Sequence, residues 1–391
     1  MTRNKLKIPK IIFDMDGVIT GEECYWDTAA LVVWEMLLGA HFLGLKPVAG
    51  LPPFKSTVNA MEIAQIRKII FQDDRVISYF KKRAVNSNWD LAYFTFAFHL
   101  VQLLTKKSAE DERKVRGIFE NALLPELRQL SEHLQLRDHY PVDFSRVLGE
   151  WSGEARGPQE LAEKIRCLLP ESCSTEAHNN IALFSILRSK VRTVFQEWYL
   201  GEQKYWDFFG KQSAVSGKKG LVYEEKPILP LEKIHSSLQE LCDQGWVLGI
   251  ATGRPFNELY APLEQMNLWS YFDDNSVVTF DVVERFEKTL GSELGNVSLS
   301  KPHPFPFLKA YWEDLYTARE LLLSSMAVPE RGTCWVVGDS LADLLGAKEM
   351  GAAFAGVLTG HSGVNYHKLF EEEGADVVLP DISYFPAFLR E

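Results

Sequence analysis

The sequence predicts an α/β fold, a doubly wound and mostly parallel sheet whose chain is interrupted by a large inserted all-α domain. Residues 8–13 form a short apolar run that ends at Asp14, which is typical of a buried parallel strand meeting a functional loop. From about residue 225 onward, strand and helix patterns alternate. The intervening stretch has helical periodicity and almost no strand pattern. Because the first strand must rejoin the later strands, the helical stretch is an insertion.

The composition is that of a globular enzyme. The 391 residues, of which 46% are hydrophobic and 24% charged, predict two or three domains with large cores. The net charge of −11 argues against a general nucleic-acid binder, which needs clustered Lys and Arg. The five cysteines form no Cys-x-x-Cys pair, so we expect reduced thiols. The apolar run near the N-terminus is too short for a signal peptide or membrane anchor, so we expect a cytoplasmic protein with no membrane partner.

The insertion is predicted to begin with a helix at about Glu23. Apolar residues then recur at spacings of three and four in several further segments. These expected helices are Val58–Phe71, Trp89–Leu104, Arg113–Leu124, Pro158–Leu169 and Ala177–Phe209. The sequence becomes rich in small residues at residues 213–220, which indicates a domain boundary. We therefore assign residues 1–22 and 221–391 to the α/β core and residues 23–220 to the inserted cap domain.

The remainder of the core is predicted to alternate helices and strands. The expected helices are residues 234–242, 255–266, 307–325 and 341–350. The expected strands are residues 246–251, 277–280, 334–337, 353–357 and 377–379. In such a sheet, ligands bind outside the carboxyl ends of the strands, where the strand order reverses. We expect four polar motifs of this chain to lie at such ends.

These four motifs combine carboxylates with residue types that bind phosphate. They are Asp14-Met15-Asp16-Gly17, Thr252-Gly253-Arg254-Pro255, Lys301-Pro302-His303-Pro304 and Gly338-Asp339-Ser340-Leu341-Ala342-Asp343. Carboxylates that converge on one point need a cation to offset their repulsion. A hydroxyl and backbone amides at a helix N-terminus bind anions. Together the motifs predict a magnesium-dependent phosphate-transfer site.

Each motif also has a simpler structural interpretation. The first motif alone is also compatible with a calcium loop or a chance surface turn. Thr252 and Ser340 are favoured helix caps. Arg254 is expected to form a surface salt bridge, with substrate contact as the alternative, and His303 is expected to be structural. The occurrence of all four motifs in one chain favours the catalytic interpretation.

In this order the motifs resemble those of the haloacid dehalogenase (HAD) superfamily, whose fold is a doubly wound, Rossmann-like sheet with an inserted cap. The resemblance covers residues 8–23 and about 225–391. It implies that Asp14 is the nucleophile that forms an aspartyl-phosphate and that Asp16 is the general acid and base. A carboxylate at the Asp16 position favours a phosphate ester substrate over a halide or a phosphonate.

The resemblance also assigns the phosphate and metal ligands. Thr252 and the Gly253 amide are expected to hold the phosphoryl oxygens, while Lys301 neutralises charge on Asp14 and on the phosphoryl group. The implied cofactor is Mg²⁺. Its implied ligands are Asp14, the Asp16 carbonyl and Asp339, with Asp343 acting through water or by orienting Lys301.

The insertion lies between the first and second motifs, as in the HAD branch that resembles phosphoglycolate phosphatases and β-phosphoglucomutases. It is far larger than the usual helical cap, so the branch implies no particular substrate. In its first helix, Trp34 is expected in the core, and Tyr25 or Trp26 either in the core or at the mouth of the site. Lys218 and Lys219 are expected in a solvated hinge, with contact to an anionic substrate as the alternative.

The leading hypothesis is a Mg²⁺-dependent phosphatase that hydrolyses a small phosphorylated metabolite through an aspartyl-phosphate on Asp14. One alternative is a sugar phosphomutase, which uses the same residues but excludes water from the intermediate. Another is a non-catalytic scaffold whose cap binds a protein partner. The sequence sets neither the substrate nor the oligomeric state.

Overall fold

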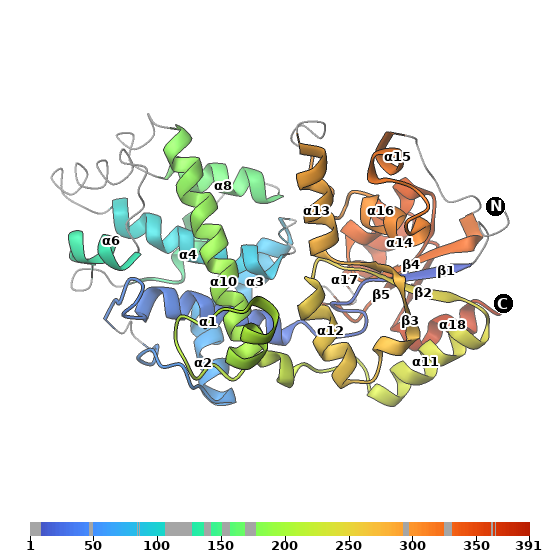
Figure 1. The fold of residues 1–391 in the computed structure, drawn as a ribbon, viewed down its shortest axis with the longest axis horizontal. Helices are drawn as coiled ribbons and strands as arrows, with labels where there is room; N and C mark the ends of the chain where they lie inside the picture. The colour runs from blue at the N-terminus through green and yellow to red at the C-terminus, as the bar shows by residue number, and fades with distance from the viewer. Residues whose placement is uncertain are drawn as a thin grey trace. The chain divides into compact units, whose positions relative to one another are not determined.

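The computed structural model of the protein forms two compact units (Figure 1). The core unit comprises Met1–Glu22 and Val222–Glu391, and the helical unit comprises Glu23–Leu221. The sequence predicts the second boundary one residue earlier. The structure describes residues 9–46, 50–83, 85, 87–105, 127–136, 142–150, 157–168, 177–291, 297–323, 331–360, 363 and 365–391.

Within its described residues, the core unit is built on a six-stranded parallel sheet with the order β3-β2-β1-β4-β5-β6. The strands are β1 (Lys10–Phe13), β2 (Val247–Ala251), β3 (Phe272–Val278), β4 (Cys334–Gly338), β5 (Ala353–Val357) and β6 (Val377–Leu379). Phe13 at the end of β1 lies opposite both Ile250 and Val337. The strands β2 and β3 follow β1 in the chain and lie on one side of it, whereas β4, β5 and β6 lie on the other side. The strand order therefore reverses at β1. This confirms the predicted doubly wound sheet.

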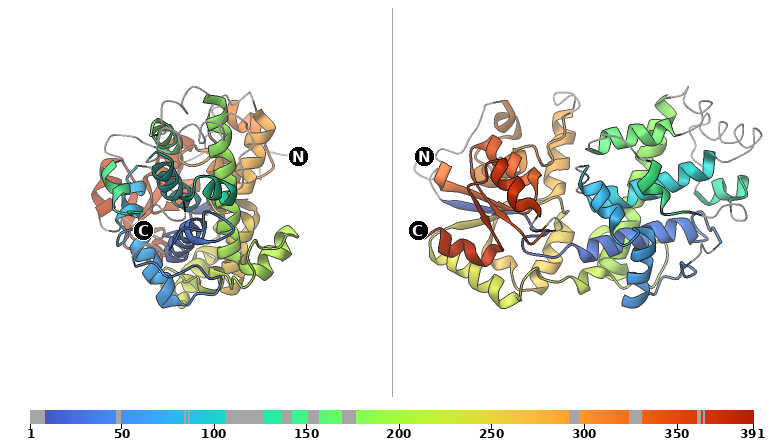
Figure 2. Two further views of the ribbon diagram at one scale, coloured as in Figure 1. Left: turned by 90° about the vertical axis from the view of Figure 1, so that its left-hand side faces the viewer. Right: turned by 180° about the vertical axis from the view of Figure 1, so that it is seen from behind.

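Helices cover both faces of the sheet (Figures 1 and 2). They are α11 (Leu231–Asp243), α12 (Phe256–Gln265), α13 (Phe280–Leu290), α14 (Phe305–Trp312), α15 (Ala318–Leu323), α16 (Leu341–Met350), α17 (Asn365–Glu372) and α18 (Phe385–Phe388). Successive strand residues point to opposite faces. Ile12 and Val336 therefore pack with α13, α14 and α16, whereas Ile11 and Val337 pack with α11 and α12. Burial on both faces explains why these strands are continuous apolar runs.

The described part of the helical unit consists of packed helices. They are α1 (Glu23–Leu38), α2 (Ala60–Ile70), α3 (Arg75–Lys81), α4 (Asn88–Thr105), α6 (Leu127–His133), α7 (Arg146–Glu150), α8 (Gly157–Cys167) and α10 (Ala177–Phe209). Trp34 is fully buried, as predicted, and Tyr25 and Trp26 are buried as well. The Tyr25 ring lies 4.6 Å from that of Tyr199, and the Arg67 guanidinium lies 4.8 Å from the Trp26 ring. Tyr25 and Trp26 are thus packing residues of this unit.

The expectation of a solvated hinge is wrong for Lys218. Its side chain is completely buried, and its Nζ lies 2.7 Å from Glu197 Oε2 and 2.8 Å from Glu35 Oε2. Two carboxylates buried among helices need a cation, and the loop after α10 supplies it. The neighbouring Lys219 is exposed.

Several predicted elements differ from the structure. The strand β3 begins at Phe272, before the predicted start at residue 277, because an edge strand tolerates the polar residues that hide it from hydropathy. The helix predicted at residues 307–325 is divided into α14 and α15, and the break begins at Glu313, whose φ is 54°. The helix predicted at Arg113–Leu124 lies outside the described residues. None of the described helices is long and apolar enough to cross a lipid bilayer.

Candidate active site

Three of the four motifs follow neighbouring strands of the core sheet. Asp14 follows β1, Thr252 follows β2 and Asp339 follows β4. Parallel neighbours end at the same edge of a sheet, so these three residues lie at one edge, where the strand order reverses. The Asp14 amide donates to the Val337 carbonyl at 2.9 Å. This bond extends the hydrogen bonding between β1 and β4 into the loop after β1. Lys301 instead lies in the loop before α14, so the prediction that all four motifs follow strands is wrong for it.

Asp14, Asp339 and Asp343 form an acidic cluster. Each offers a carboxylate oxygen, and these oxygens lie within 4.8 Å of one another. The backbone approaches Asp339 closely: a Cβ on Gly17 would lie 2.5 Å from Asp339 Oδ2, and a Cβ on Gly360 would lie 1.7 Å from it. Only glycine fits at such distances. The cluster is therefore set in a glycine cradle that holds the Asp339 carboxylate against the loop after β1.

Lys301 is the cation of this cluster. Its Nζ lies 2.9 Å from Asp14 Oδ1 and 2.7 Å from Asp343 Oδ1. Burial alone would lower the pKa of Lys301, but the two carboxylates raise it above its ordinary value. Burial raises the pKa of Asp14 to about 7, an effect that Lys301 opposes and that Asp343 and Asp16 reinforce. One ammonium therefore lies between two carboxylates of the three-carboxylate cluster.

Asp343 is held at both of its oxygens. Ser340 begins α16 as its N-cap, accepting a hydrogen bond from the Asp343 amide. The Ser340 hydroxyl also donates to Asp343 Oδ2 at 2.6 Å. The other oxygen, Oδ1, contacts Lys301. Ser340 therefore is the helix cap that its residue type indicates, and this cap fixes a carboxylate that in turn orients Lys301.

Arg254 does not form the predicted surface salt bridge, because its side chain is buried. Its Nη2 lies 2.5 Å from Asp16 Oδ1 and 2.6 Å from Glu225 Oε1, and it donates to the Thr20 hydroxyl at 2.8 Å. The backbone of Arg254 is tied on both sides, since its amide donates to Thr252 Oγ1 and its carbonyl accepts from the Phe280 amide. Its side chain is thereby committed to the interior of the core unit.

Asp14 and Asp16 are thus paired with different cations although they are two residues apart. Asp14 contacts Lys301, and Asp16 contacts Arg254. Such a separation lets two neighbouring carboxylates take different chemical roles.

Thr252 lies in a tight turn after β2. It is buried, its amide donates to the Val278 carbonyl at 2.9 Å, and its Oγ1 accepts from the Arg254 amide at 3.1 Å. The helix-cap interpretation of Thr252 is wrong, because the residue at the N-cap position of α12 is Pro255. Gly253 is exposed, and nothing lies within 4 Å of a Cβ built on it. The turn therefore leaves open space beside Gly253.

Sequence reasoning missed Glu225 and Thr20. Both lie on the segments that join the core unit to the helical unit, and these segments pair with each other. The Gly21 amide donates to the Lys226 carbonyl, and the Ile228 amide donates to the Ile19 carbonyl. No motif marks Glu225, because its burial depends on the distant Arg254. Gly360 was missed for a similar reason, since only the fold brings it against Asp339.

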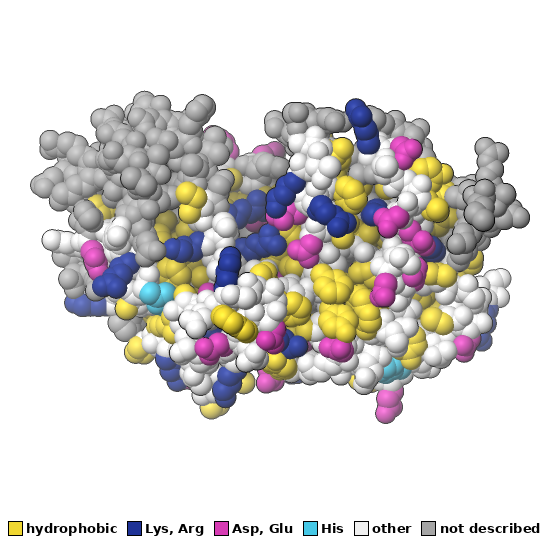
Figure 3. Space-filling view, in the orientation of Figure 1, with side chains coloured by type: hydrophobic (Ala, Val, Ile, Leu, Met, Phe, Trp, Pro, Cys, Tyr) yellow, Lys and Arg dark blue, Asp and Glu magenta, His cyan; other side chains and the backbone are white. Residues whose placement is uncertain are grey.

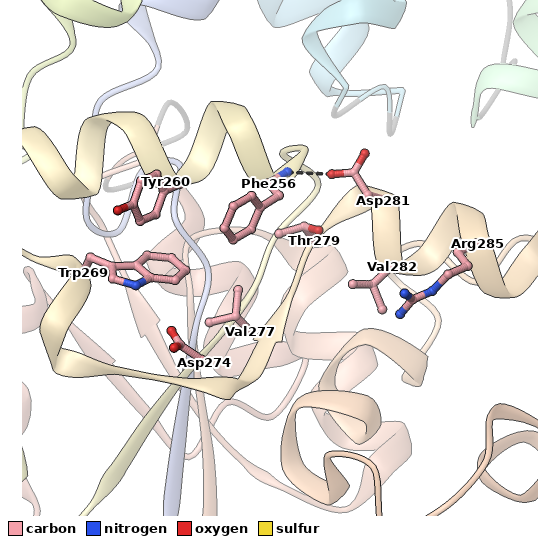
Figure 4. A pocket seen from close by; sticks show the side chains of 9 residues that line it. All are labelled: Phe256, Tyr260, Trp269, Asp274, Val277, Thr279, Asp281, Val282 and Arg285. Atoms are coloured by element: carbon pink, nitrogen blue, oxygen red, sulfur yellow. Dashed lines mark hydrogen bonds between the residues drawn. The ribbon is translucent and has the colours of Figure 1, made fainter. Parts of the chain in front are cut away.

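The described residues also form a separate pocket of about 610 Å³ beside β3. Figure 4 shows its lining from α12, β3 and α13, and Figure 3 shows apolar side chains gathered over α12. The lining residues are Phe256, Tyr260, Trp269, Asp274, Val277, Thr279, Asp281, Val282 and Arg285. The dashed contact in Figure 4 joins the Phe256 amide to Asp281 at 2.6 Å. This pocket is lined by none of the cluster residues, so it is separate from the acidic cluster.

Comparisons with known proteins agree with the fold. Residues 298–384 match the family model described as HAD-hydrolase-like. An X-ray structure of a Northeast Structural Genomics Consortium target is 30% identical, with a TM-score of 0.76 and 98% of each chain covered.

A curated relative matches part of the chain. The "Probable phosphatase IndB" of Dickeya dadantii (strain 3937) is 32% identical over 139 residues, which are 36% of this chain and 48% of that protein. The chain thus spans about half the length of this curated relative. The family model includes Lys301, Asp339 and Asp343, and the similar X-ray structure extends over both units. The chain belongs to the haloacid dehalogenase superfamily.

Proposed function

We propose that this protein is a Mg²⁺-dependent phosphatase that hydrolyses a small phosphorylated metabolite through an aspartyl-phosphate on Asp14. The observation that carries the proposal is the convergence of Asp14, Lys301 and the acidic cluster at the carboxyl edge of the sheet. The three converging carboxylates suit a divalent cation. The Lys301 ammonium offsets charge on a phosphoryl group. The naming of the curated relative as a phosphatase supports the same reaction class.

The first half of the reaction transfers the phosphoryl group to the protein. A carboxylate oxygen of Asp14 attacks phosphorus, and the bond from phosphorus to the leaving oxygen breaks. The bonding electron pair stays on that oxygen, which takes a proton from the Asp16 carboxyl group. Thr252 and the Gly253 amide hold the phosphoryl oxygens during the transfer. An alcohol leaves, and Asp14 becomes an acyl phosphate.

The second half returns the protein to its starting state. The Asp16 carboxylate takes a proton from water, whose oxygen attacks phosphorus. The bond between phosphorus and Asp14 breaks, and its electron pair restores the Asp14 carboxylate. Inorganic phosphate leaves, and Asp16 is protonated for the next turnover.

The cluster also fits the cation that this reaction class uses. Its donors are hard carboxylate oxygens, which Mg²⁺ prefers, and the glycine cradle keeps Asp339 in place. The residues that would hold Mg²⁺ are Asp14, Asp339 and the Asp16 carbonyl, while Asp343 acts through Lys301. A bound cation supplies positive charge that offsets charge on the phosphoryl oxygens.

The test of the proposed function is phosphate release from phosphorylated metabolites and from 4-nitrophenyl phosphate, measured with Mg²⁺ and with EDTA. We expect release that requires Mg²⁺, with a preference for one class of metabolite. Sugar phosphate isomerisation without phosphate release would favour the mutase instead. A protein that shows no turnover and binds neither Mg²⁺ nor phosphate analogues would favour the scaffold.

Gly360→Ala is expected to weaken Mg²⁺ binding by about 10- to 100-fold, because the added Cβ would displace the Asp339 carboxylate. Isothermal titration with MgCl₂ measures this affinity without substrate. Gly332→Ala is the matched control, because nothing lies within 4 Å of a Cβ at that position. Unchanged Mg²⁺ affinity in Gly360→Ala would argue that Asp339 is not a metal ligand.

A further inference from the structure

We propose that Arg254 is a positioning residue for Asp16. Its guanidinium, anchored by Glu225 and Thr20, orients the Asp16 carboxylate so that Oδ2 exchanges the proton with the leaving oxygen and with water. This inference rests on the proposed phosphatase function. It goes beyond that function because it assigns a task to Arg254 and Glu225, which the reaction scheme does not use.

The contacts between Arg254 and Asp16 fix the plane of the carboxylate. The Nε of Arg254 lies 3.2 Å from each Asp16 oxygen, and its Nη2 lies 2.5 Å from Oδ1. A planar guanidinium with several donors in fixed directions sets both the position and the rotation of a carboxylate. A lysine, which is a point charge on a flexible stem, would set only a distance.

The guanidinium is itself held firmly. Its Nη2 contacts Glu225 and Thr20, and its Nη1 donates to the Glu258 carbonyl at 3.4 Å. The Thr20 hydroxyl donates in turn to the Met15 carbonyl, which precedes Asp16. A catalytic carboxylate works best when a locked network keeps it within a fraction of an ångström of its productive position.

The side chains of this network differ in their exposure to solvent. The side chains of Arg254 and Glu225 are each 1% exposed, whereas that of Asp16 is 24% exposed. The shortest contact binds Oδ1, at 2.5 Å, whereas Oδ2 lies 3.2 Å from Nε. Oδ2 is therefore the oxygen assigned to proton transfer. Glu225 shares the positive charge of Arg254, so that Asp16 faces an ion pair and not a lone cation.

This arrangement predicts that a change at Arg254 lowers kcat/KM by a factor that depends on the leaving group of the substrate. An alkoxide needs a proton in order to leave, whereas 4-nitrophenolate leaves without one near neutral pH. The kcat/KM value reports the steps up to departure of the leaving group. A misplaced Asp16 therefore lowers kcat/KM for alkyl phosphates and spares it for 4-nitrophenyl phosphate. The attack of water on the aspartyl-phosphate also needs Asp16. For the aryl substrate, kcat and KM are therefore expected to fall by the same factor.

The experiment compares Arg254→Lys with wild type on 4-nitrophenyl phosphate and on an alkyl phosphate that wild type hydrolyses. We expect kcat/KM to fall by about 100-fold for the alkyl phosphate and by less than about threefold for the aryl phosphate. Glu225→Gln, which loosens the anchor but keeps Arg254, is the second variant and is expected to show the same split with a smaller loss. It serves as the deciding variant if Arg254→Lys does not fold.

Arg67→Lys is the matched control. Arg67 is a mostly buried arginine whose Nε and Nη2 contact both oxygens of Asp74, in the helical unit. The Arg67→Lys variant is expected to retain wild-type kinetics on both substrates. Equal losses of kcat/KM on the two substrates, or no loss on either, would overturn the inference while wild type remains a phosphatase. An inactive wild type would instead overturn the proposed function.

Discussion

Asp14→Asn is expected to lower kcat by about 10⁴-fold or more, because an amide cannot form the acyl phosphate. The fold is expected to survive, since Lys301 keeps its contact with Asp343. Burial and the neighbouring carboxylates raise the pKa of Asp14 to about 7, so its charged form is disfavoured in the folded protein. Asn removes that charge, and the melting temperature is expected to equal or exceed that of wild type.

Steady-state phosphate release and thermal unfolding measure the two effects. Asp314→Asn is the matched control, because this side chain is 97% exposed and pairs with Lys309 away from the cluster. It is expected to keep wild-type turnover. If Asp14→Asn kept turnover within tenfold of wild type, Asp14 would not be the nucleophile.

Lys218→Met is expected to lower the free energy of unfolding of the helical unit by about 3–5 kcal/mol. Lys218 lies between Glu35 and Glu197, whose side chains are 0% and 3% exposed. Met fills the space of the lysine stem but leaves two buried carboxylates without their cation. The cost arises from removing the lysine charge beside two buried carboxylates and not from a cavity.

Urea denaturation followed by tryptophan fluorescence measures this loss, because the Trp198 ring lies 5.0 Å from Lys218 Nζ. Lys219→Met is the control next to it in the chain, and its exposed side chain predicts a change below about 0.5 kcal/mol. Equal urea midpoints for the two variants would mean that the pairing of Lys218 with Glu35 and Glu197 contributes no net stability.

The layout of the fold and of the acidic cluster could be predicted because local patterns carry it. Apolar runs mark β1 and β4, and the acidic residues directly after each run mark their carboxyl ends. Parallel strands that end at one edge bring Asp14 and Asp339 together without further information. The sequence could not show that Gly360 also lies at this edge, since the close approach to Asp339 depends on a loop after β5.

The partners of buried charges could not be predicted. Arg254 and Asp16 are 238 residues apart, and their pairing depends on the direction of side chains in two loops. Lys218 follows Ser213–Gly217, a stretch whose composition is typical of a solvated loop. Its burial is decided by Glu35, which is 183 residues away. The charge of a residue and the composition around it predict whether that residue is exposed to solvent. Here, burial depends instead on an ion pair with a residue that is distant in the sequence.

The most direct test of the central claim is to identify the residue that carries the phosphoryl group. Wild type is mixed with Mg²⁺ and an accepted substrate, quenched, reduced with sodium borohydride and digested for peptide mass spectrometry. Reduction of an aspartyl-phosphate yields homoserine, and we predict homoserine at position 14, absent without substrate and absent in Asp14→Asn. Homoserine at another aspartate, or none while phosphate is released, would contradict the proposed mechanism.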